Sequence, residues 1–241
     1  MTAPLSSKAV KRILQDIENI SKDDIRSQGI FYEFDESNIS QGTALVIGPS
    51  DTPYEGGFYF FSVKFPPNYP FDPPAMSTLT QDGFTRFNPN MYREGKVCLS
   101  LLNTWHVGDK WSGCQSLSSV FLSILTSVLV PDPVFNEPGF EGKEGHKEQS
   151  AVYNRMILHA NLQTAVIDMI KNPPPFAKPF YSHMVESFLK NRTKLNDLAV
   201  SMVDFDNKTE TMSFFRMTRT YEFSTLGDKL LECTPLNTIS E

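Results

Sequence analysis

The order of the periodic segments constrains the fold of this 241-residue chain more than any other feature of its sequence. An apolar stripe with helical spacing comes first, over about 7–20, with Ser6 or Ser7 as its candidate cap. Shorter segments with strand-like composition follow, at about 30–35, 43–48, 58–65 and 75–79. Because strands and helices are grouped rather than alternating, we expect an α+β fold built on a four-stranded antiparallel meander. A doubly wound parallel sheet is disfavoured for the same reason.

Helical spacing dominates the second half of the chain. The predicted helices span about 116–130, 147–171 and 180–203. Asn172 and the three prolines that follow it end the second helix and mark a natural boundary. We therefore expect a domain over 1–173 and a largely helical C-terminal extension over 174–241. Within this extension, the segment 214–223 is compatible with a strand or a helix.

Composition and charge exclude several classes of function. The net charge of −6 argues against a general binder of nucleic acid or of anionic membranes. No apolar run reaches 18 residues, so we expect no membrane span, and the first residues lack the pattern of a signal peptide. The three cysteines are too widely spaced for a disulfide framework or a zinc site, which favours a reducing cytoplasmic or nuclear location. No nucleotide-binding motif is present, and we expect no metal and no cofactor.

The segment Phe65–Pro74 holds five prolines in ten residues. Such a composition is typical of a flexible linker, but here the aromatic side chains of Phe65, Tyr69 and Phe71 interleave with the prolines. This arrangement favours a rigid loop that is packed on the core.

Cys98 lies in the segment Asn88–Ser100, directly after an Asn-Pro-Asn turn and a glycine-centred turn. A thiol placed in this way is predicted to be presented for chemistry. An ordinary cysteine is only about 7% thiolate at pH 7.4, and a hydrolase would raise that fraction with a histidine. His106 is the histidine nearest in sequence, but it lies in no recognisable triad motif. A cysteine hydrolase and an inert core cysteine therefore stay open as alternatives.

Four segments of the chain resemble the ubiquitin-conjugating enzyme family, in the family's order and spacing. Gly48–Phe58 resembles its signature hairpin, and Phe65–Pro74 resembles the proline loop that follows. Phe87–Leu99 resembles its active-site segment, and Trp111–Ser112 the tryptophan segment after it. The resemblance covers about 7–172 and implies the fold of this family, the UBC fold.

The details resemble one branch of the family. Asn88 stands where most members have the histidine of His-Pro-Asn, a position whose role in the family is mainly structural. The segments 101–105 and 135–141 also resemble this branch, which carries a helical C-terminal extension.

The resemblance implies a role for four residues near the reaction centre. Cys98 would accept the modifier as a thioester, and the amide of Asn90 would stabilise the oxyanion or brace the loop. Glu137 is the candidate acidic gate that orients the attacking lysine, and Tyr92 would line the same site. An ordinary lysine is only about 0.1% neutral at pH 7.4, so the acceptor amine needs such help. Trp111 is expected to pack beneath the loop.

The resemblance also implies two docking surfaces. Lys11 and Arg12 on the first helix match basic positions that contact the activating enzyme. Phe71 matches the aromatic residue that ligases contact, together with Ser112 and Gly113 in a second loop. The family's usual proline is absent from this second loop, so we expect the loop to be more flexible than in other members.

These implications define an expected function. The chain is expected to be a monomer that takes ubiquitin or a ubiquitin-like modifier from an activating enzyme and passes it to a protein substrate, usually with a ligase. The activating enzyme, and not this chain, would use ATP. Dedication to a different ubiquitin-like modifier, or a non-catalytic role in the ubiquitin pathway, are the alternatives.

Overall fold

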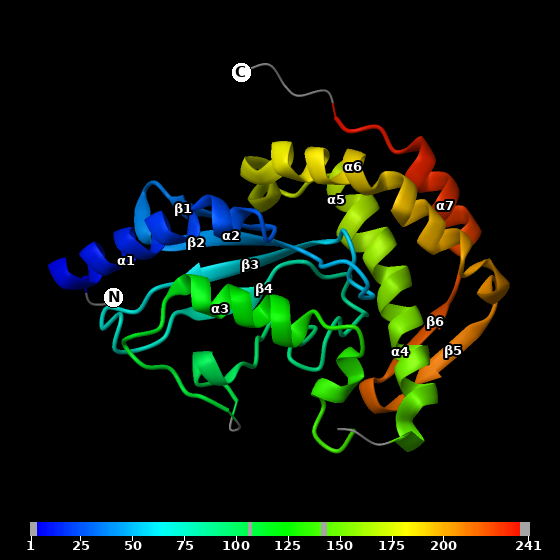
Figure 1. Cartoon of the computed structure of the whole chain (residues 1–241), viewed down its shortest axis with the longest axis horizontal. Helices are drawn as coiled ribbons and strands as arrows, with labels where there is room; N and C mark the ends of the chain where they lie inside the picture. Colours follow the sequence, from blue (N-terminus) through cyan, green and yellow to red (C-terminus); the bar gives the residue numbers. More distant parts are fainter. Residues whose placement is uncertain (1–3, 106–107, 141–143, 237–241) are drawn as a thin grey trace.

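The computed structural model describes residues 4–105, 108–140 and 144–236. Its centre is a four-stranded antiparallel sheet in the order β1-β2-β3-β4, as the sequence predicts (Figure 1). The strands are β1 (Ile30–Asp35), β2 (Asn38–Ile47), β3 (Phe58–Lys64) and β4 (Ala75–Thr78). β2 begins earlier than the predicted residue 43, because Asn38 already pairs with Asp35 beyond a register shift in β1. The polar residues at this end of β2 do not alternate with apolar ones, so the sequence pattern misses them.

One face of the sheet is covered by α1 (Ser7–Ile20) and α3 (Leu117–Ser123), which also contact each other. The side chain of Ser6 caps α1 by accepting a hydrogen bond of 3.1 Å from the Ala9 amide. Phe61 of β3 meets Phe121 of α3 with ring centroids 6.0 Å apart. The predicted helix 116–130 is therefore present, although its last part, η2 (Ile124–Val128), is wound as a π-helix.

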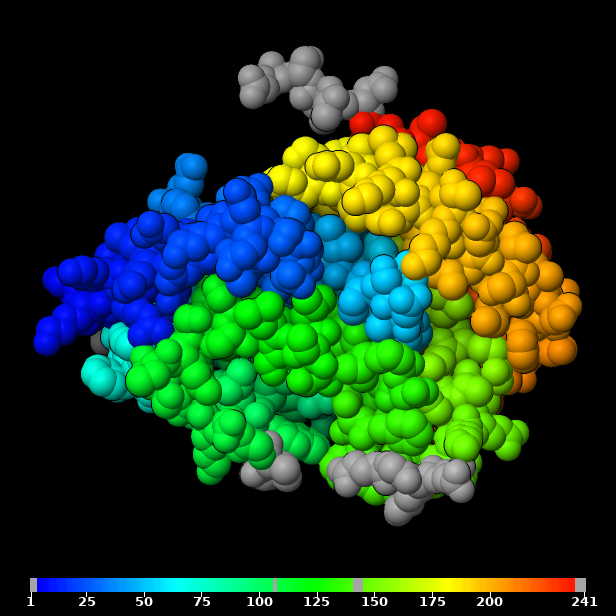
Figure 2. All heavy atoms as spheres, viewed as in Figure 1, coloured from blue at the N-terminus to red at the C-terminus, as the bar shows by residue number. Residues whose placement is uncertain are grey.

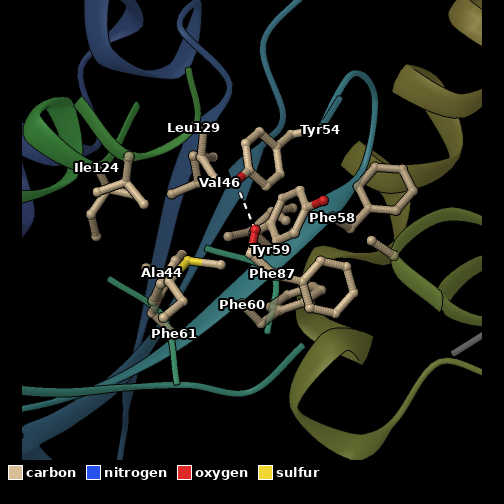
Figure 3. Close-up of a cluster of buried hydrophobic side chains, with 14 of the residues drawn as sticks. Ala44, Val46, Tyr54, Phe58, Tyr59, Phe60, Phe61, Phe87, Ile124 and Leu129 are labelled. Carbon is tan, nitrogen blue, oxygen red and sulfur yellow. Dashed lines mark hydrogen bonds between the residues drawn. The ribbon is translucent and has the colours of Figure 1, made fainter. Parts of the chain in front are cut away.

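The opposite face of β3 is buried as well, which the sequence pattern does not predict. Phe58 and Phe60 are both fully buried, like Phe61 on the first face. Phe60 contacts Phe176 and Phe180, with ring centroids 5.3 and 5.5 Å apart. These two rings belong to η6 (Pro175–Phe180), the start of the C-terminal extension. The extension thus completes the hydrophobic core of the sheet, part of which is drawn in Figure 3.

The predicted helix 147–171 is present as one continuous helical segment beside the sheet. It consists of α4 (Lys147–Ala160), the π-helical η5 (Asn161–Asp168) and α5 (Met169–Lys171). Asn161 is fully buried and links this segment to the signature hairpin, because its amide accepts from the Tyr59 hydroxyl (2.7 Å) and donates to the Glu55 carbonyl (2.9 Å). A Cβ atom at Gly57 would lie 1.9 Å from the Asn161 Oδ1, so glycine is required at this close approach.

The C-terminal extension is less helical than the sequence predicts. It holds α6 (Tyr181–Val200) and α7 (Phe223–Glu232), but a two-stranded hairpin lies between them. This hairpin pairs β5 (Thr209–Met212) with β6 (Met217–Thr220), and β5 contacts α4 (Figure 1). The segment 214–223, for which the sequence is compatible with a strand or a helix, forms a turn and a strand, followed by the start of α7. Strands of four residues with alternating threonines give too weak a pattern to predict.

The remaining elements are short. They are α2 (Asp23–Arg26), η1 (Ser100–Leu102), η3 (Pro133–Asn136), η4 (Glu144–His146), η7 (Val203–Phe205) and η8 (Ser213–Phe215). Figure 2 shows α6 lying against the N-terminal part of the chain, where His183 stacks on Phe31 with ring centroids 4.3 Å apart. Within the described ranges, no helix combines the length and apolar character needed to cross a membrane.

His159 is a buried contact between α4 and the extension. Its Nδ1 lies 3.1 Å from the Arg219 guanidinium, and its Nε2 accepts a hydrogen bond of 3.2 Å from the Glu222 amide. Burial, and secondarily the charges of Arg219 and Lys229, lower the pKa of His159 from 6.5 to about 4. The imidazole is therefore neutral in the folded protein at neutral pH.

We expect the docking of the extension to weaken in acid. Between pH 6.5 and about 4 the unfolded chain binds a proton at His159 that the folded chain does not, so the free energy of unfolding falls as the pH falls. The loss from this residue is at most roughly 3 kcal/mol. Urea denaturation at pH 7 and pH 4.5 should show a smaller loss in His159→Gln than in the wild type, with His146→Gln as the matched control. An equal loss in His159→Gln and the wild type would contradict this expectation.

Candidate active site

Cys98 lies in the loop between β4 and η1, and its backbone is clamped by Asn90. The Cys98 amide donates to the Asn90 carbonyl (2.8 Å), and the Asn90 side-chain amide donates to the Cys98 carbonyl (2.7 Å). The sequence therefore identifies two residues that the fold brings into direct contact. The predicted open presentation of the thiol is wrong, because Cys98 is only 2% exposed. The two turns fold the backbone around the cysteine instead of lifting it into solvent.

Asn88 is the buried centre of the turn before Cys98. It is fully buried, and its amide nitrogen donates to the Tyr54 hydroxyl (2.9 Å) and to the Val128 carbonyl (2.7 Å). Its amide oxygen accepts from the Asn90 backbone amide at 2.8 Å. The Tyr54 hydroxyl donates in turn to the Phe87 carbonyl (2.7 Å; Figure 3). Asparagine at this position thus joins the signature hairpin, the end of η2 and the turn that carries Asn90.

The second turn returns the chain from Tyr92 to Cys98. The Tyr92 amide donates to the Lys96 carbonyl at 2.9 Å, and the Gly95 amide donates to the Tyr92 carbonyl at 3.0 Å. Gly95 has a φ of +94°, and a Cβ atom there would lie 3.2 Å from the Thr78 carbonyl oxygen. Glycine is therefore needed for the turn to pass close to β4.

Thr104 supports the other side of Cys98 and is a residue that the sequence analysis missed. Its hydroxyl accepts from the Leu99 amide (2.9 Å) and donates to the Val97 carbonyl (2.9 Å). One side chain thus fixes the residues immediately before and after Cys98. A threonine in a loop carries no signal of its own that would have identified it.

Glu137 and Tyr92 are brought together through Arg86, a second residue that the sequence analysis missed. The Glu137 Oε2 lies 3.6 Å from the Arg86 Nη2, and the Arg86 Cζ lies 4.0 Å from the centroid of the Tyr92 ring. The Arg86 Nη2 also donates to the Pro89 carbonyl at 2.5 Å, next to Asn90. Burial raises the pKa of Glu137, and the charge of Arg86 opposes this rise.

The two predicted ligase-docking segments lie side by side. Phe71 is 77% exposed, whereas Phe65 and Tyr69 in the same loop are buried, so the proline segment is packed on the core as predicted. The Trp111 indole donates to the Pro70 carbonyl at 2.8 Å, which joins the proline loop to the loop of Ser112 and Gly113. Trp111 itself is buried, in agreement with its predicted packing role.

Arg12 is engaged within the chain. Its guanidinium donates to the Gly113 carbonyl at 2.8 Å and to the Gln115 carbonyl, and it pairs with the buried Asp16 at 3.1 Å. The loop that lacks the family's proline is thereby tied to α1. Lys11 is the exposed member of the basic pair. The docking role of both residues stays a prediction.

The histidine partner of a hydrolase is not supported by the described contacts. His106 lies outside the described residues. His159 and His183 make their contacts with the extension and with Phe31, and no histidine in the described ranges is hydrogen-bonded to Cys98. No group of potential metal ligands is found among the residues that the structure describes.

The fold and this loop define a known class of protein, and comparison with known proteins agrees. A family model described as "Ubiquitin-conjugating enzyme" matches residues 12–156, which include Asn90, Cys98 and Glu137. The chain therefore belongs to the ubiquitin-conjugating enzyme family, as its motifs predict.

Several curated relatives share this region. "Ubiquitin-conjugating enzyme E2 Z" from Homo sapiens is 44% identical over 190 residues, covering 78% of this chain and 51% of the relative. The protein of that name from Danio rerio is 44% identical over 186 residues, covering 77% of this chain and 55% of the relative. "Dual E2 ubiquitin-conjugating enzyme/E3 ubiquitin-protein ligase BIRC6" from Homo sapiens is 40% identical over 172 residues, or 66% of this chain and 4% of the relative. The chain thus spans about half the length of the first two relatives.

A solved structure agrees with the fold assignment. The E2 domain of a Toxoplasma gondii ubiquitin conjugating enzyme superposes with a TM-score of 0.50 at 26% sequence identity. The match covers 65% of this chain and 98% of that domain. It therefore supports the UBC fold.

Proposed function

We propose that this chain accepts ubiquitin, or a ubiquitin-like modifier, as a thioester on Cys98 and transfers it to a substrate lysine. The observation that carries the proposal is the reciprocal backbone clamp between Asn90 and Cys98, within a segment that matches the family model. This clamp fixes the carbonyl of the reacting residue and places an amide donor beside it.

The proposed reaction has two acyl transfers. The Cys98 sulfur attacks the carbonyl carbon of the modifier's C-terminal thioester, and the thiolate of the activating enzyme leaves. The neutral amine of a substrate lysine then attacks the new thioester, and the Cys98 thiolate leaves as the isopeptide bond forms. Because the acyl group arrives already activated, Cys98 does not need a histidine base. The amide of Asn90 either stabilises the oxyanion or keeps the loop in the geometry that the second step requires.

Glu137 is proposed to orient the acceptor lysine. The carboxylate is half-buried beside Arg86, so it is held in one position rather than free in solvent. Tyr92, whose ring also contacts Arg86, would line the same site.

The proposed partners follow from the two docking surfaces. An activating enzyme would contact the exposed Lys11 on α1, and ligases would contact Phe71 with the adjacent Ser112 and Gly113. We further propose that the chain acts as a monomer in the cytoplasm or nucleus, without a cofactor of its own. The negative charge favours protein partners over nucleic acid or membranes.

Formation of the thioester tests the proposed function. After incubation with activating enzyme, ATP and modifier, electrophoresis without thiol should show an adduct that disappears with thiol. Cys98→Ala should form no adduct, whereas Cys98→Lys should form a thiol-resistant isopeptide product. Cys114→Ser, which changes an exposed cysteine, is the matched control and should charge like the wild type. An undiminished adduct in Cys98→Ala, or no adduct with any modifier, would refute the proposal.

A further inference from the structure

The turn of the β5–β6 hairpin contacts the loop that carries Cys98. The Arg93 guanidinium donates to the Phe215 carbonyl at 2.6 Å and to the Arg216 carbonyl at 3.0 Å. Phe215 is only 4% exposed, although it belongs to a short turn. Thus a segment more than a hundred residues away in sequence from Arg93 is packed on the active-site loop.

Arg86 contacts two aromatic rings, one from each of these segments. Its Cζ lies 4.0 Å from the Tyr92 ring centroid and 5.1 Å from the Phe215 ring centroid. The backbone amide of Arg86 also lies 3.3 Å from the Met217 sulfur. The hairpin therefore contacts both the backbone and the guanidinium of Arg86. Cation–π contacts of this kind strengthen when the cation is desolvated, and the Arg86 side chain is largely buried.

The polar contacts of Arg86 lead toward the reaction centre. One of its terminal nitrogens donates to the Pro89 carbonyl at 2.5 Å and lies 3.6 Å from the Glu137 carboxylate. Its Nε is buried and has no hydrogen-bond partner. The guanidinium is therefore held by the two rings and by its outer nitrogens, and losing one ring would free it to turn away from Glu137.

The hairpin is fixed independently of Arg86. Arg219 of β6 donates to the Asp82 carboxylate (3.0 Å) and to the Thr85 hydroxyl (2.6 Å), directly before Arg86 in the chain. Arg155 of α4 forms a bidentate pair with Glu210 of β5 at 2.9 and 2.5 Å. A change confined to the turn should therefore leave the hairpin in place.

We propose that Arg86 is a positioning residue for Glu137 and that Phe215 of the C-terminal hairpin holds Arg86 in place. The C-terminal extension would thereby complete the part of the active site where the acceptor lysine binds. It would affect the rate of transfer to lysine rather than the loading of Cys98. This inference rests on the proposed function, because it assigns a task within the second acyl transfer.

The charge relations around Glu137 give the inference a specific consequence. Arg86 is the cation that faces its carboxylate, and the buried Tyr153 hydroxyl interacts electrostatically with both of them. Burial alone favours the protonated carboxyl, and a nearby guanidinium favours the carboxylate. When Arg86 is displaced, Glu137 should stay protonated to higher pH. As the pH is lowered, the rate of transfer should therefore begin to fall at a higher pH than in the wild type.

The test uses the full chain and separates loading from transfer. Four chains are charged with the modifier: the wild type, Phe215→Leu, Arg86→Lys and Phe214→Leu. The activating enzyme is then stopped with EDTA, and the rate at which the thioester is lost to free lysine is measured from pH 6 to 9. Phe214→Leu is the matched control, because Phe214 is exposed and touches the Phe215 ring (centroids 5.1 Å apart) but makes no contact with Arg86 among those described. We expect charging to fall by no more than about twofold, and transfer by roughly tenfold in Phe215→Leu and Arg86→Lys. In Phe215→Leu the pH below which transfer slows should be higher than in the wild type, and in Arg86→Lys, which keeps a positive charge, the shift should be smaller.

Three results would overturn the inference. Unchanged transfer in Phe215→Leu and Arg86→Lys would show that the hairpin has no part in it. An equal loss of charging and transfer, with an unshifted pH profile, would show that the contact only stabilises the fold. A wild-type chain that never charges would refute the proposed function and this inference together, and charging is measured first so that this failure is distinguishable.

Discussion

Replacing Asn90 by alanine should slow transfer of the modifier from Cys98 to free lysine by roughly 10²-fold or more. The side-chain amide of Asn90 donates to the Cys98 carbonyl, so the variant loses the brace of the loop and, with it, the amide that is proposed to stabilise the oxyanion. Single-turnover discharge of the purified thioester measures this effect. Charging should fall much less, because the first transfer starts from a thioester bound on another enzyme.

Asn90→Asp sharpens this prediction. Aspartate has the same shape but lacks the N–H donor, and its charge would face the Cys98 carbonyl, so the loss should be at least as large as in Asn90→Ala. Asn191→Ala is the matched control, because that amide donates to the Ser187 carbonyl (3.0 Å) within α6. Discharge within threefold of the wild type in both Asn90 variants would contradict the role assigned to this residue.

Replacing Asn88 by alanine should lower the free energy of unfolding by about 3 kcal/mol. The substitution leaves the Val128 carbonyl and the Asn90 amide without their partner in a fully buried site. Each buried polar group left unpaired costs about 1–3 kcal/mol. For a chain of this size the corresponding loss in melting temperature is on the order of 10 °C.

Urea denaturation and calorimetry measure the effect of Asn88→Ala. Asn191→Ala again serves as the control and should cost no more than about 1 kcal/mol, because its side chain bonds to the Ser187 carbonyl within α6 and is partly exposed. A loss in Asn88→Ala no larger than in the control would show that the buried network around Asn88 is not a structural centre.

Local sequence patterns were sufficient to predict much of the fold. The helix at 7–20 and the four strands depend on spacing within ten residues or so, and the structure confirms them. The contact between Asn90 and Cys98 was also within reach, since both residues lie in one pair of turns.

Contacts between distant segments were beyond the reach of the sequence pattern. The burial of Phe60 could not be predicted, because no local signal shows that Phe176 and Phe180 return to cover it. Arg86 is an isolated arginine in the sequence, and only the fold places Phe215 and Glu137 around it.

Intact-protein mass spectrometry of the charging reaction tests the central claim most directly. With activating enzyme, ATP and modifier, the wild-type chain should gain the mass of one modifier less one water, and thiol should remove this gain completely. Peptide mapping under non-reducing conditions should place the adduct on Cys98. An adduct on Cys114 or Cys233, a gain in mass that survives thiol, or the same gain in Cys98→Ala would contradict the claim that Cys98 carries the acyl group.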